Sequence, residues 1–288
     1  EIVRSISEKT IADALFRYAV YIAGRRTKRG TVDYGLGDWC PVTVVKAPVE
    51  LTSSIMTMDI LKKCSYIFNV LGRSLQKDYC DKVYNEVRAA VRKYFVDWGT
   101  MTVSGNCQTS QSMAIFYDVF DESEKPQAAK VLVDIIKQSD DHIDFGFLGI
   151  LTVFRVLCQY GECDLAYKMI ARQDYPSFGD WVKRGFTSMP ERFFRDGEFP
   201  DSLNHHAFAD ISAIFIEYFA GIKVNPYGDD CKEVNIEPCF VKALNNASAF
   251  YDSVCGKVGV KWERAFNGIK LSVEIPEGIY GEIRLPVG

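Results

Sequence analysis

The chain has 288 residues, of which 48% are apolar and 13% aromatic, enough for a substantial core in one large domain or two of unequal size. Its formal net charge of -4 argues against a nucleic-acid-binding protein, because such proteins carry a basic excess that neutralises phosphates. The best candidate for a membrane span, FGFLGILTVF at 145–154, is too short, so no membrane partner is expected.

Up to about residue 224, apolar residues recur at three- and four-residue steps, which predicts amphipathic helices. The first two stripes run over residues 15–22 and 56–71, and Gly72 is expected to end the second helix. Further helices are expected at residues 75–95, 108–120, 123–138, 147–160, 162–172 and 204–222. The first part of the chain is therefore predicted to be an assembly of helices.

Several of these helices are joined by long connections. Residues 24–48, 96–107, 139–146 and 173–203 are rich in Gly, Asp, Trp, Tyr and Pro. Long structured loops on a helical scaffold are where binding and catalytic residues usually lie. We therefore expect the functional residues in or beside these four segments.

After residue 224 the pattern changes to alternating and β-branched residues between Gly and Pro, which is typical of strands. Strands are expected at residues 234–241, 247–254, 256–265, 268–276 and 280–288. The sequence thus predicts a mainly α protein with a helical domain at residues 1–224. Residues 225–288 are predicted to form a small antiparallel β-sandwich domain.

Nine cysteines are scattered along the chain without a Cys-x-x-Cys pair. Most fall in apolar helical patterns, as Cys64 and Cys80 do, which favours reduced, buried thiols and a cytoplasmic location. Cys158 and Cys163 are the nearest pair, and no histidine is close to them in sequence, whereas a zinc site requires clustered ligands. No metal and no cofactor is expected.

Glu191 directly follows Pro190 in the connection at 173–203. It is either an ordinary helix start, with its charge near the N-terminal dipole, or a functional carboxylate. Aromatic residues surround it in sequence: Trp181, Phe186, Phe193 and Phe194. An aromatic wall beside a carboxylate is typical of sugar sites, because sugar C–H faces pack on rings while hydroxyls need polar partners. The aromatic neighbours favour a functional role.

Two of the three histidines, His205 and His206, are adjacent. Adjacent residues of a helix point about 100° apart, so these imidazoles would make a poor chelating pair. One is expected to face inward and the other outward. The residue types alone favour a helix start capped by Asn204 or Ser202, and a place in a binding site is the alternative.

Asp38 and Trp39 follow a Gly-x-Gly turn in the segment YGLGDWCP, residues 34–41. The segment lacks the longer glycine pattern and the Lys-Ser/Thr ending of phosphate-binding loops. A carboxylate beside an indole is again a sugar-like pairing. A capped, partly buried loop tryptophan is the alternative interpretation.

Taken in order, the segments of the chain resemble the C-terminal part of the α-L-rhamnosidases of glycoside hydrolase family 78. The matching segments are VDYGLGDWCP, APVELTSS, DDHIDFGFLG, ECDLAYKMIARQDYPSFGDWV, TSMPER, SLNHHAF and DISAIFIEYFAGI, followed by ASAFYDSVCGKVGVKWER and RLPVG. The likeness covers nearly the whole chain, and the order of the segments is more specific than any one of them.

The resemblance implies a partial (α/α)6 barrel of the six-hairpin glycosidase type, followed by a small antiparallel β-sandwich domain. It also implies release of terminal L-rhamnose, with inversion, from a rhamnosylated glycoside or oligosaccharide. Inversion uses two carboxyl groups roughly 6.5–9.5 Å apart, with a water between one of them and the sugar. By position, Glu191 resembles the general base that activates this water. Substrate-binding roles are implied for Asp38, Trp39, His205, Trp181 and His142.

The chain departs from the family pattern at Pro190 and Phe193, where family members often have Trp, and in its short loop from Glu191 to Asn204. Nothing matches the upstream Asp-Cys-Pro-x-Arg-Asp-Glu motif that carries the family's general acid. We interpret the chain as a fragment that begins partway through the barrel and whose sandwich is cut short as well. Such a fragment is expected to be inactive alone and to form a homo-oligomer through exposed barrel faces.

Two other functions stay open. One is an (α/α)6 hydrolase for another deoxy sugar or for a uronide. A uronide enzyme needs Arg or Lys to meet the carboxylate, whereas the loops here offer mainly Asp, Glu, His and aromatic residues, which favours a neutral sugar. The other is a non-catalytic carbohydrate-binding protein, which the missing acid motif favours.

Overall fold

The computed structural model describes residues 8–228 and 231–286. Packing of the chain divides it into two compact units. The first unit runs to Val156 and takes in Arg192–Phe194, and the second consists of Leu157–Glu191 and the chain from Arg195 onward. The expected domain boundary at residue 224 stays a prediction.

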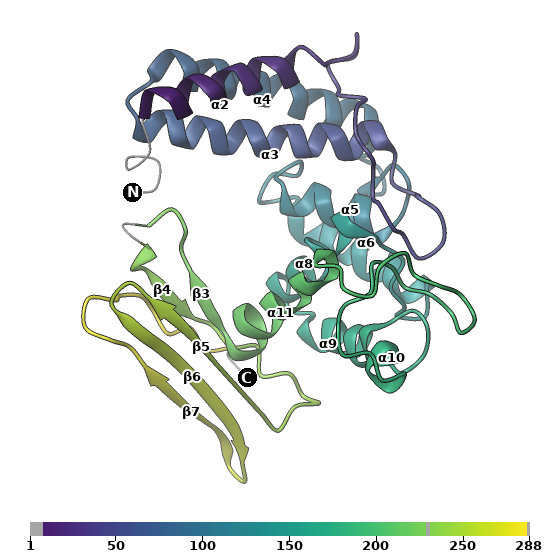
Figure 1. The fold of residues 1–288 in the computed structure, drawn as a ribbon, viewed down its shortest axis with the longest axis vertical. Helices are drawn as coiled ribbons and strands as arrows, with labels where there is room; N and C mark the ends of the chain where they lie inside the picture. The colour runs from purple at the N-terminus through teal and green to yellow at the C-terminus, as the bar shows by residue number, and fades with distance from the viewer. Residues whose placement is uncertain (1–7, 229–230, 287–288) are drawn as a thin grey trace. The chain divides into compact units, whose positions relative to one another are not determined.

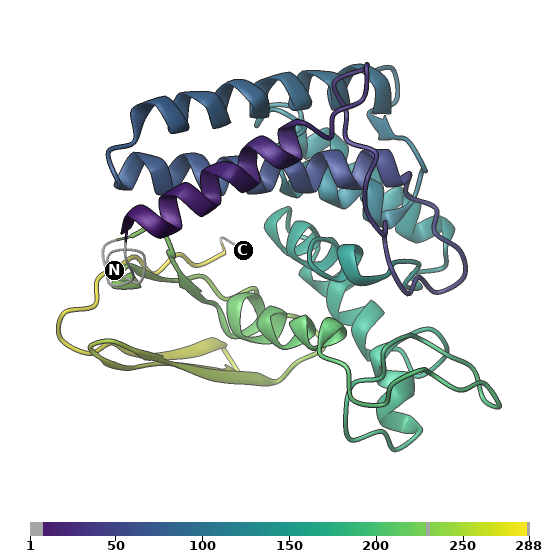
Figure 2. The same ribbon diagram turned by 45° about the horizontal axis from the view of Figure 1, so that its top comes forward.

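Three neighbouring helices form a bundle within the first unit (Figures 1 and 2): α2 (Glu8–Ala23), α3 (Val49–Val70) and α4 (Ser74–Phe95). The expected end of the second helix at Gly72 is confirmed, because α3 stops just before this glycine, which has a φ of 66°. The helix begins at Val49, earlier than its apolar stripe indicated. Its fully buried face is formed by Leu51, Ile55, Met58, Leu61 and Phe68.

Shorter elements complete the first unit: β1 (Val96–Asp97), β2 (Thr102–Val103), α5 (Gln108–Phe116), α6 (Lys125–Gln138) and α7 (Phe147–Ile150). Helix α5 is almost entirely buried, so its polar side chains need partners inside the protein. Gln111 accepts from the Val103 amide and donates to the carbonyls of Met101 and Ala128, each at 3.0 Å. One buried amide side chain thereby ties the β1–β2 hairpin and α6 to α5.

The single helix expected over residues 147–160 is two helices, α7 and α8 (Val153–Gln159). The turn between them is tightened at Thr152, whose amide donates to the Gly149 carbonyl at 3.0 Å. The Thr152 hydroxyl donates to the same carbonyl and to that of Leu148. Side-chain bonds of this kind compete with the helical ladder, which explains the break.

The helices of the second unit that follow α8 are short: α9 (Cys163–Ala171), α10 (Phe178–Lys183), the 3₁₀ turn η1 (Ala207–Asp210), α11 (Ile211–Ile214) and the π-helical η2 (Phe215–Ala220). Helix α10 lies in a segment expected to be a loop. Ser177 caps it, accepting from the Asp180 amide at 3.0 Å. The helix expected over 204–222 begins only at Ala207 and is followed by Gly221, where a Cβ would lie 2.3 Å from the Pro238 nitrogen.

Antiparallel strands follow in two sheets: β3 (Ile222–Val224) with β4 (Val234–Ile236), and β5 (Asn246–Ser253), β6 (Gly256–Ala265) and β7 (Gly268–Glu274) in that order. The two sheets share one apolar core that includes Ile222, Val234, Ile236, Val258 and Val260. The expected alternation along β6 is confirmed, because the residues that point to one face of the strand are buried.

The last expected strand is reduced to isolated bridges. Tyr280 pairs with Glu233 and Ile283 with Ile236, both in parallel, and residues 287–288 lie outside the described residues. The chain is thus mainly α, with small antiparallel sheets in its C-terminal region, as expected.

Two carboxylates in the first unit hold ion pairs that depend on pH. Asp118 lies 2.6 Å from the Nζ atoms of both Lys125 and Lys62. Burial raises the pKa of Asp118, but these two ammonium groups outweigh it and hold the pKa below its usual 3.8. The two hydrogen bonds from Arg92 hold the pKa of Glu124 below its usual 4.5.

Acid is therefore expected to destabilise the first unit. A carboxyl with a lowered pKa contributes stability that is fully present above its usual pKa and is lost as the pH falls through the lowered value. The loss should begin below about pH 4.5. Urea unfolding at pH 6, 4 and 3, followed by circular dichroism, measures it. Asp118→Asn should flatten the dependence, and Asp134→Asn, an exposed change on α6, should not.

Candidate functional site

The loop after α10 is closed by hydrogen bonds between its two ends. The Glu191 amide donates to the Ser202 carbonyl at 2.9 Å, and the His205 amide donates to the Met189 carbonyl at 2.8 Å. These bonds fix the backbone of the loop that follows α10 (Figure 1), which carries both Glu191 and His205. Two residues far apart along the loop are therefore held at one place.

Glu191 and His205 face each other across this closure. Glu191 Oε1 lies 3.9 Å from His205 Nε2, and 18% of the Glu191 side chain is exposed. The Ala207 amide donates to His205 Nδ1 at 3.2 Å. Because Nδ1 accepts, a neutral imidazole carries its proton on Nε2, on the side of the carboxylate. The pair offers a proton acceptor beside an N–H donor, which suits a water and a sugar hydroxyl.

The helix interpretation of His205 and His206 is wrong. Both precede the first helical residue, and their rings stack with centroids 5.1 Å apart. Neither Asn204 nor Ser202 caps the helix, since the Ser202 hydroxyl accepts from the Asn204 amide at 3.2 Å. His205 is partly buried and His206 is exposed, but their stacked rings lie side by side rather than one inward and one outward.

Trp181 lines an apolar cavity of about 670 Å³ within the second unit. Its side chain is 3% exposed and packs edge-on against the rings of Phe178 and Phe208. Met189, which accepts the His205 amide, lines the same cavity. The indole of Trp181 is therefore buried in the wall of this cavity.

The aromatic wall expected beside Glu191 is divided in the structure. Trp181 and Phe186 line the cavity of the second unit. Phe193 and Phe194 are buried and belong to the first unit. Closeness in sequence placed all four rings around Glu191, but the chain changes units directly after this residue.

Asp38 joins three segments of the first unit. It is 3% exposed, and its carboxylate accepts from the Thr109 hydroxyl on α5. It also accepts from the amides of Gly146 and Leu148 at 2.8 Å and of Gly149 at 3.3 Å, at the start of α7. Burial raises the pKa of Asp38, and these four donors offset the rise only in part. Its bonds make Asp38 an anchor for the loop.

Trp39 is presented to solvent by this anchor. It is 49% exposed, and its carbonyl accepts from the Phe147 amide at 2.9 Å. Gly146 permits this approach, because a Cβ there would lie 2.2 Å from the Trp39 oxygen. His142 lies on the same connecting segment as Gly146, residues 139–146. The His142 carbonyl accepts a hydrogen bond from Gln108 Nε2 at 2.7 Å. The exposed indole is the group here that is free to pack on a sugar face.

The expected site residues therefore fall into two groups. Asp38, Trp39 and His142 belong to the first unit, and Glu191 and His205 belong to the second, where Trp181 lines the cavity. Sequence reasoning missed Thr109 and Gly146, which hold Asp38. They lie 71 and 108 residues from it, so no local pattern could indicate them.

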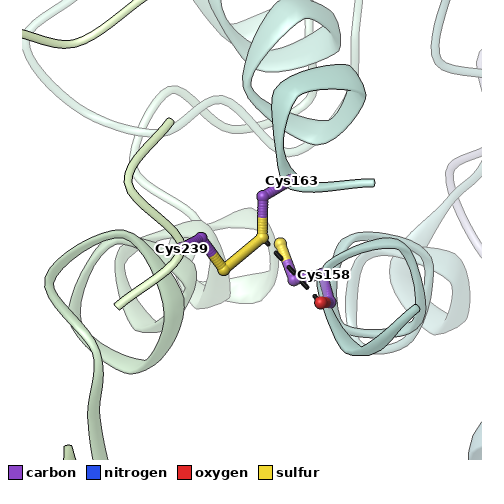
Figure 3. A group of neighbouring side chains, drawn as sticks. All are labelled: Cys158, Cys163 and Cys239. Atoms are coloured by element: carbon purple, nitrogen blue, oxygen red, sulfur yellow. Dashed lines mark hydrogen bonds between the residues drawn. A yellow bond between two sulfur atoms is a disulfide. The ribbon is translucent and has the colours of Figure 1, made fainter. Parts of the chain in front are cut away.

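The structure joins Cys163 and Cys239 in a disulfide across 76 residues of sequence. The expectation of reduced thiols is therefore wrong for this pair. Cys158 lies beside them, and the three sulfurs lie within 4.8 Å of one another (Figure 3). Cys239 lies far from the other two cysteines in sequence, so its place beside them could not be predicted from spacing.

Over residues 8–228 and 231–286, every helix is too short or too polar to cross a membrane.

Two protein-family models match almost the whole chain. The bacterial alpha-L-rhamnosidase 6 hairpin glycosidase domain matches residues 12–219, and the bacterial alpha-L-rhamnosidase C-terminal domain matches residues 221–288. With the mainly helical fold and its short antiparallel sheets, the first match defines the class, that of the six-hairpin glycosidases. The chain belongs to the bacterial α-L-rhamnosidase family.

Similar proteins bear the same name. An α-L-rhamnosidase of Formosa agariphila is 30% identical over 224 residues, which are 75% of this chain and 24% of that protein. One of Alteromonas sp. (strain LOR) is 30% identical over 205 residues, 68% of this chain and 22% of that protein. The fold is similar to the Streptomyces avermitilis α-L-rhamnosidase complexed with L-rhamnose, with a TM-score of 0.86 at 22% identity, over 94% of this chain and 26% of that chain. The chain thus spans about a quarter of the length of these relatives.

Proposed function

We propose that this chain is part of an inverting α-L-rhamnosidase that hydrolyses terminal L-rhamnose from a rhamnosylated glycoside or oligosaccharide, with Glu191 as the general base. The Glu191–His205 pair carries the proposal: a partly exposed carboxylate lies 3.9 Å from an imidazole nitrogen on a closed loop. The names of the relatives, one of them with L-rhamnose bound, support the choice of sugar.

In this mechanism Glu191 takes a proton from a water that attacks the anomeric carbon on the face opposite the leaving group. His205, with its proton on Nε2, donates to a sugar hydroxyl beside the carboxylate. The general acid is assigned to the family motif that this sequence does not contain. The chain would then supply the base side of the reaction.

Of the other site residues, some are proposed to contact the sugar and others to hold the contacting residues in place. Trp39 offers an exposed ring for the C–H face of the sugar, and Asp38 holds the loop that presents it. Trp181 contributes to the site as part of the wall of its cavity. His142 contributes as part of the segment that packs beside Trp39. These roles are proposals that rest on the geometry of each group.

Release of nitrophenol from an aryl α-L-rhamnoside tests the function. We expect no release by the 288-residue chain, since it lacks the acid motif, and release by a version extended upstream. Turnover by the chain alone would refute the assignment of the acid. An extended version that cleaves only another aryl glycoside would indicate a different sugar. One that binds L-rhamnose without cleaving any glycoside would indicate a binding protein. The family match favours neither of these alternatives.

Self-association through apolar helix faces is a further expected property. Helix α2 exposes Tyr18, Val20 and Tyr21, each by more than two fifths of its surface. Contiguous exposed apolar surface favours association. Light scattering over a range of concentrations should show a rising mass, and a Tyr18→Ser, Tyr21→Ser double variant should lower it. A monomer at every concentration would contradict this.

A cytoplasmic location is likewise a proposal. Seven cysteines lie outside the disulfide and four of these are buried, which suits a reducing compartment. The Cys163–Cys239 disulfide is the feature that such a compartment would open. Alkylation in intact cells followed by mass spectrometry decides the matter. Both cysteines alkylated would support the cytoplasm, and an intact disulfide would indicate an oxidising compartment.

A further inference from the structure

Three cysteine sulfurs meet in the second unit. Cys158 lies near the end of α8, Cys163 is the first residue of α9, and Cys239 follows β4. All three sulfurs lie within 4.8 Å of one another, and Figure 3 shows them converging from three separate segments. Cys158 and Cys163 are buried, whereas Cys239 is partly exposed. A buried sulfur cluster with one accessible member has the form of a metal-binding site.

The spacing suits one thiophilic ion. Zinc binds thiolates at about 2.3 Å, so three thiolates around one zinc lie roughly 3.8 Å apart. Small rotations of the side chains bring sulfurs from at most 4.8 Å to that separation. The supporting backbone is fixed, because the Cys239 amide donates to the Tyr218 carbonyl at 3.0 Å.

A bound divalent cation deprotonates the thiols that it binds, so all three cysteines can bind the ion as thiolates.

We propose that, once the Cys163–Cys239 disulfide is reduced, Cys158, Cys163 and Cys239 together bind one thiophilic divalent ion of the zinc type. A dithiol reductant supplies the two electrons and two protons that convert the disulfide into two thiols. Binding of the ion then releases three protons, one from each sulfur, and the partly exposed Cys239 marks the side of entry. The disulfide and the metal are mutually exclusive, and each fastens the segment after β4 to the start of α9. Under reducing conditions the ion replaces the disulfide as the tie.

Cobalt is the probe for this site. The full chain is reduced with a phosphine, freed of reductant under nitrogen and titrated with Co²⁺. We expect a thiolate-to-cobalt charge-transfer band that saturates at one ion per chain and that Zn²⁺ abolishes. The oxidised chain should show no band. Cys158→Ser and Cys239→Ser should each lose it, whereas Cys80→Ser and Cys255→Ser, which lie outside the cluster, should keep it.

A reduced chain without the band, or a band that survives Cys158→Ser, overturns the proposal. Circular dichroism checks that each variant is folded. If Cys158→Ser is not, Cys239→Ser carries the test, because Cys239 is the partly exposed member. A band that Cys239→Ser leaves unchanged refutes the three-sulfur site in the same way.

Discussion

Replacing Asp38 by Ala is expected to lower the free energy of unfolding of the first unit by on the order of 3 kcal/mol or more. The carboxylate accepts from Thr109 and from the amides of Gly146, Leu148 and Gly149, and the site is almost fully buried. The variant leaves four donors without their acceptor and without access to water. Each such donor costs about 1–3 kcal/mol, although the costs are not additive. Urea unfolding followed by circular dichroism measures the loss.

Two control variants separate hydrogen bonding from charge and from general loop effects. Asp38→Asn keeps one acceptor oxygen but turns an NH₂ group toward backbone donors, so an intermediate loss is expected. Asp33→Ala changes an exposed carboxylate of the same loop and should leave the midpoint unchanged. An Asp38→Ala midpoint equal to that of Asp33→Ala would contradict the anchoring role.

Asp38 should also oppose the acid destabilisation expected from Asp118 and Glu124. Burial raises its pKa, so its contribution to stability is greatest below the usual 3.8 and is lost as the pH rises through the raised value. In Asp38→Asn this opposing contribution is absent. The variant should therefore lose stability more steeply than the parent chain as the pH falls from 6 to 3. An unchanged steepness would contradict the raised pKa.

Elements whose packing depends on their own periodicity could be predicted from the sequence. Helices α4 and α6 lie close to their expected ranges, and β5, β6 and β7 follow the predicted alternation. Short elements could not be predicted from periodicity. Helix α10 has six residues, and its signal is a single capping serine, Ser177. The stretch expected as one helix from residue 204 starts later, because the His205 amide donates to the Met189 carbonyl and holds this residue in the closed loop.

The candidate site was predictable only in part, for a similar reason. The resemblance pointed to Glu191 and His205, but their 3.9 Å approach depends on hydrogen bonds across the loop. The bonds of Asp38 reach over 71 to 111 residues, so the sequence could not indicate that Asp38 is a buried anchor carrying an exposed Trp39. Contacts over such separations leave no periodic pattern, and the same is true of Cys239 beside Cys158 and Cys163.

In the upstream-extended chain, Glu191→Gln is expected to lower turnover of an aryl α-L-rhamnoside by about 10²–10⁴-fold, the usual contribution of a general base. Gln keeps the size of Glu and can still meet His205, but it cannot take a proton from water. The loss should fall on kcat, with binding of L-rhamnose little changed. Glu198→Gln is the matched control, because Glu198 is an exposed carboxylate on the same loop. It should leave turnover intact.

Rescue by azide distinguishes a base from a structural carboxylate. In Glu191→Ala the water has no base, but azide needs none and can attack the anomeric carbon from the vacated side. The expected product is a rhamnosyl azide of inverted configuration, formed faster as azide is added. A structural role predicts that azide restores nothing and that Glu191→Gln loses stability together with activity. The configuration of the rhamnose released by the extended chain with Glu191 intact separates a base from a nucleophile: retention there would show that Glu191 acts as a nucleophile, since a retaining enzyme passes through a covalent intermediate.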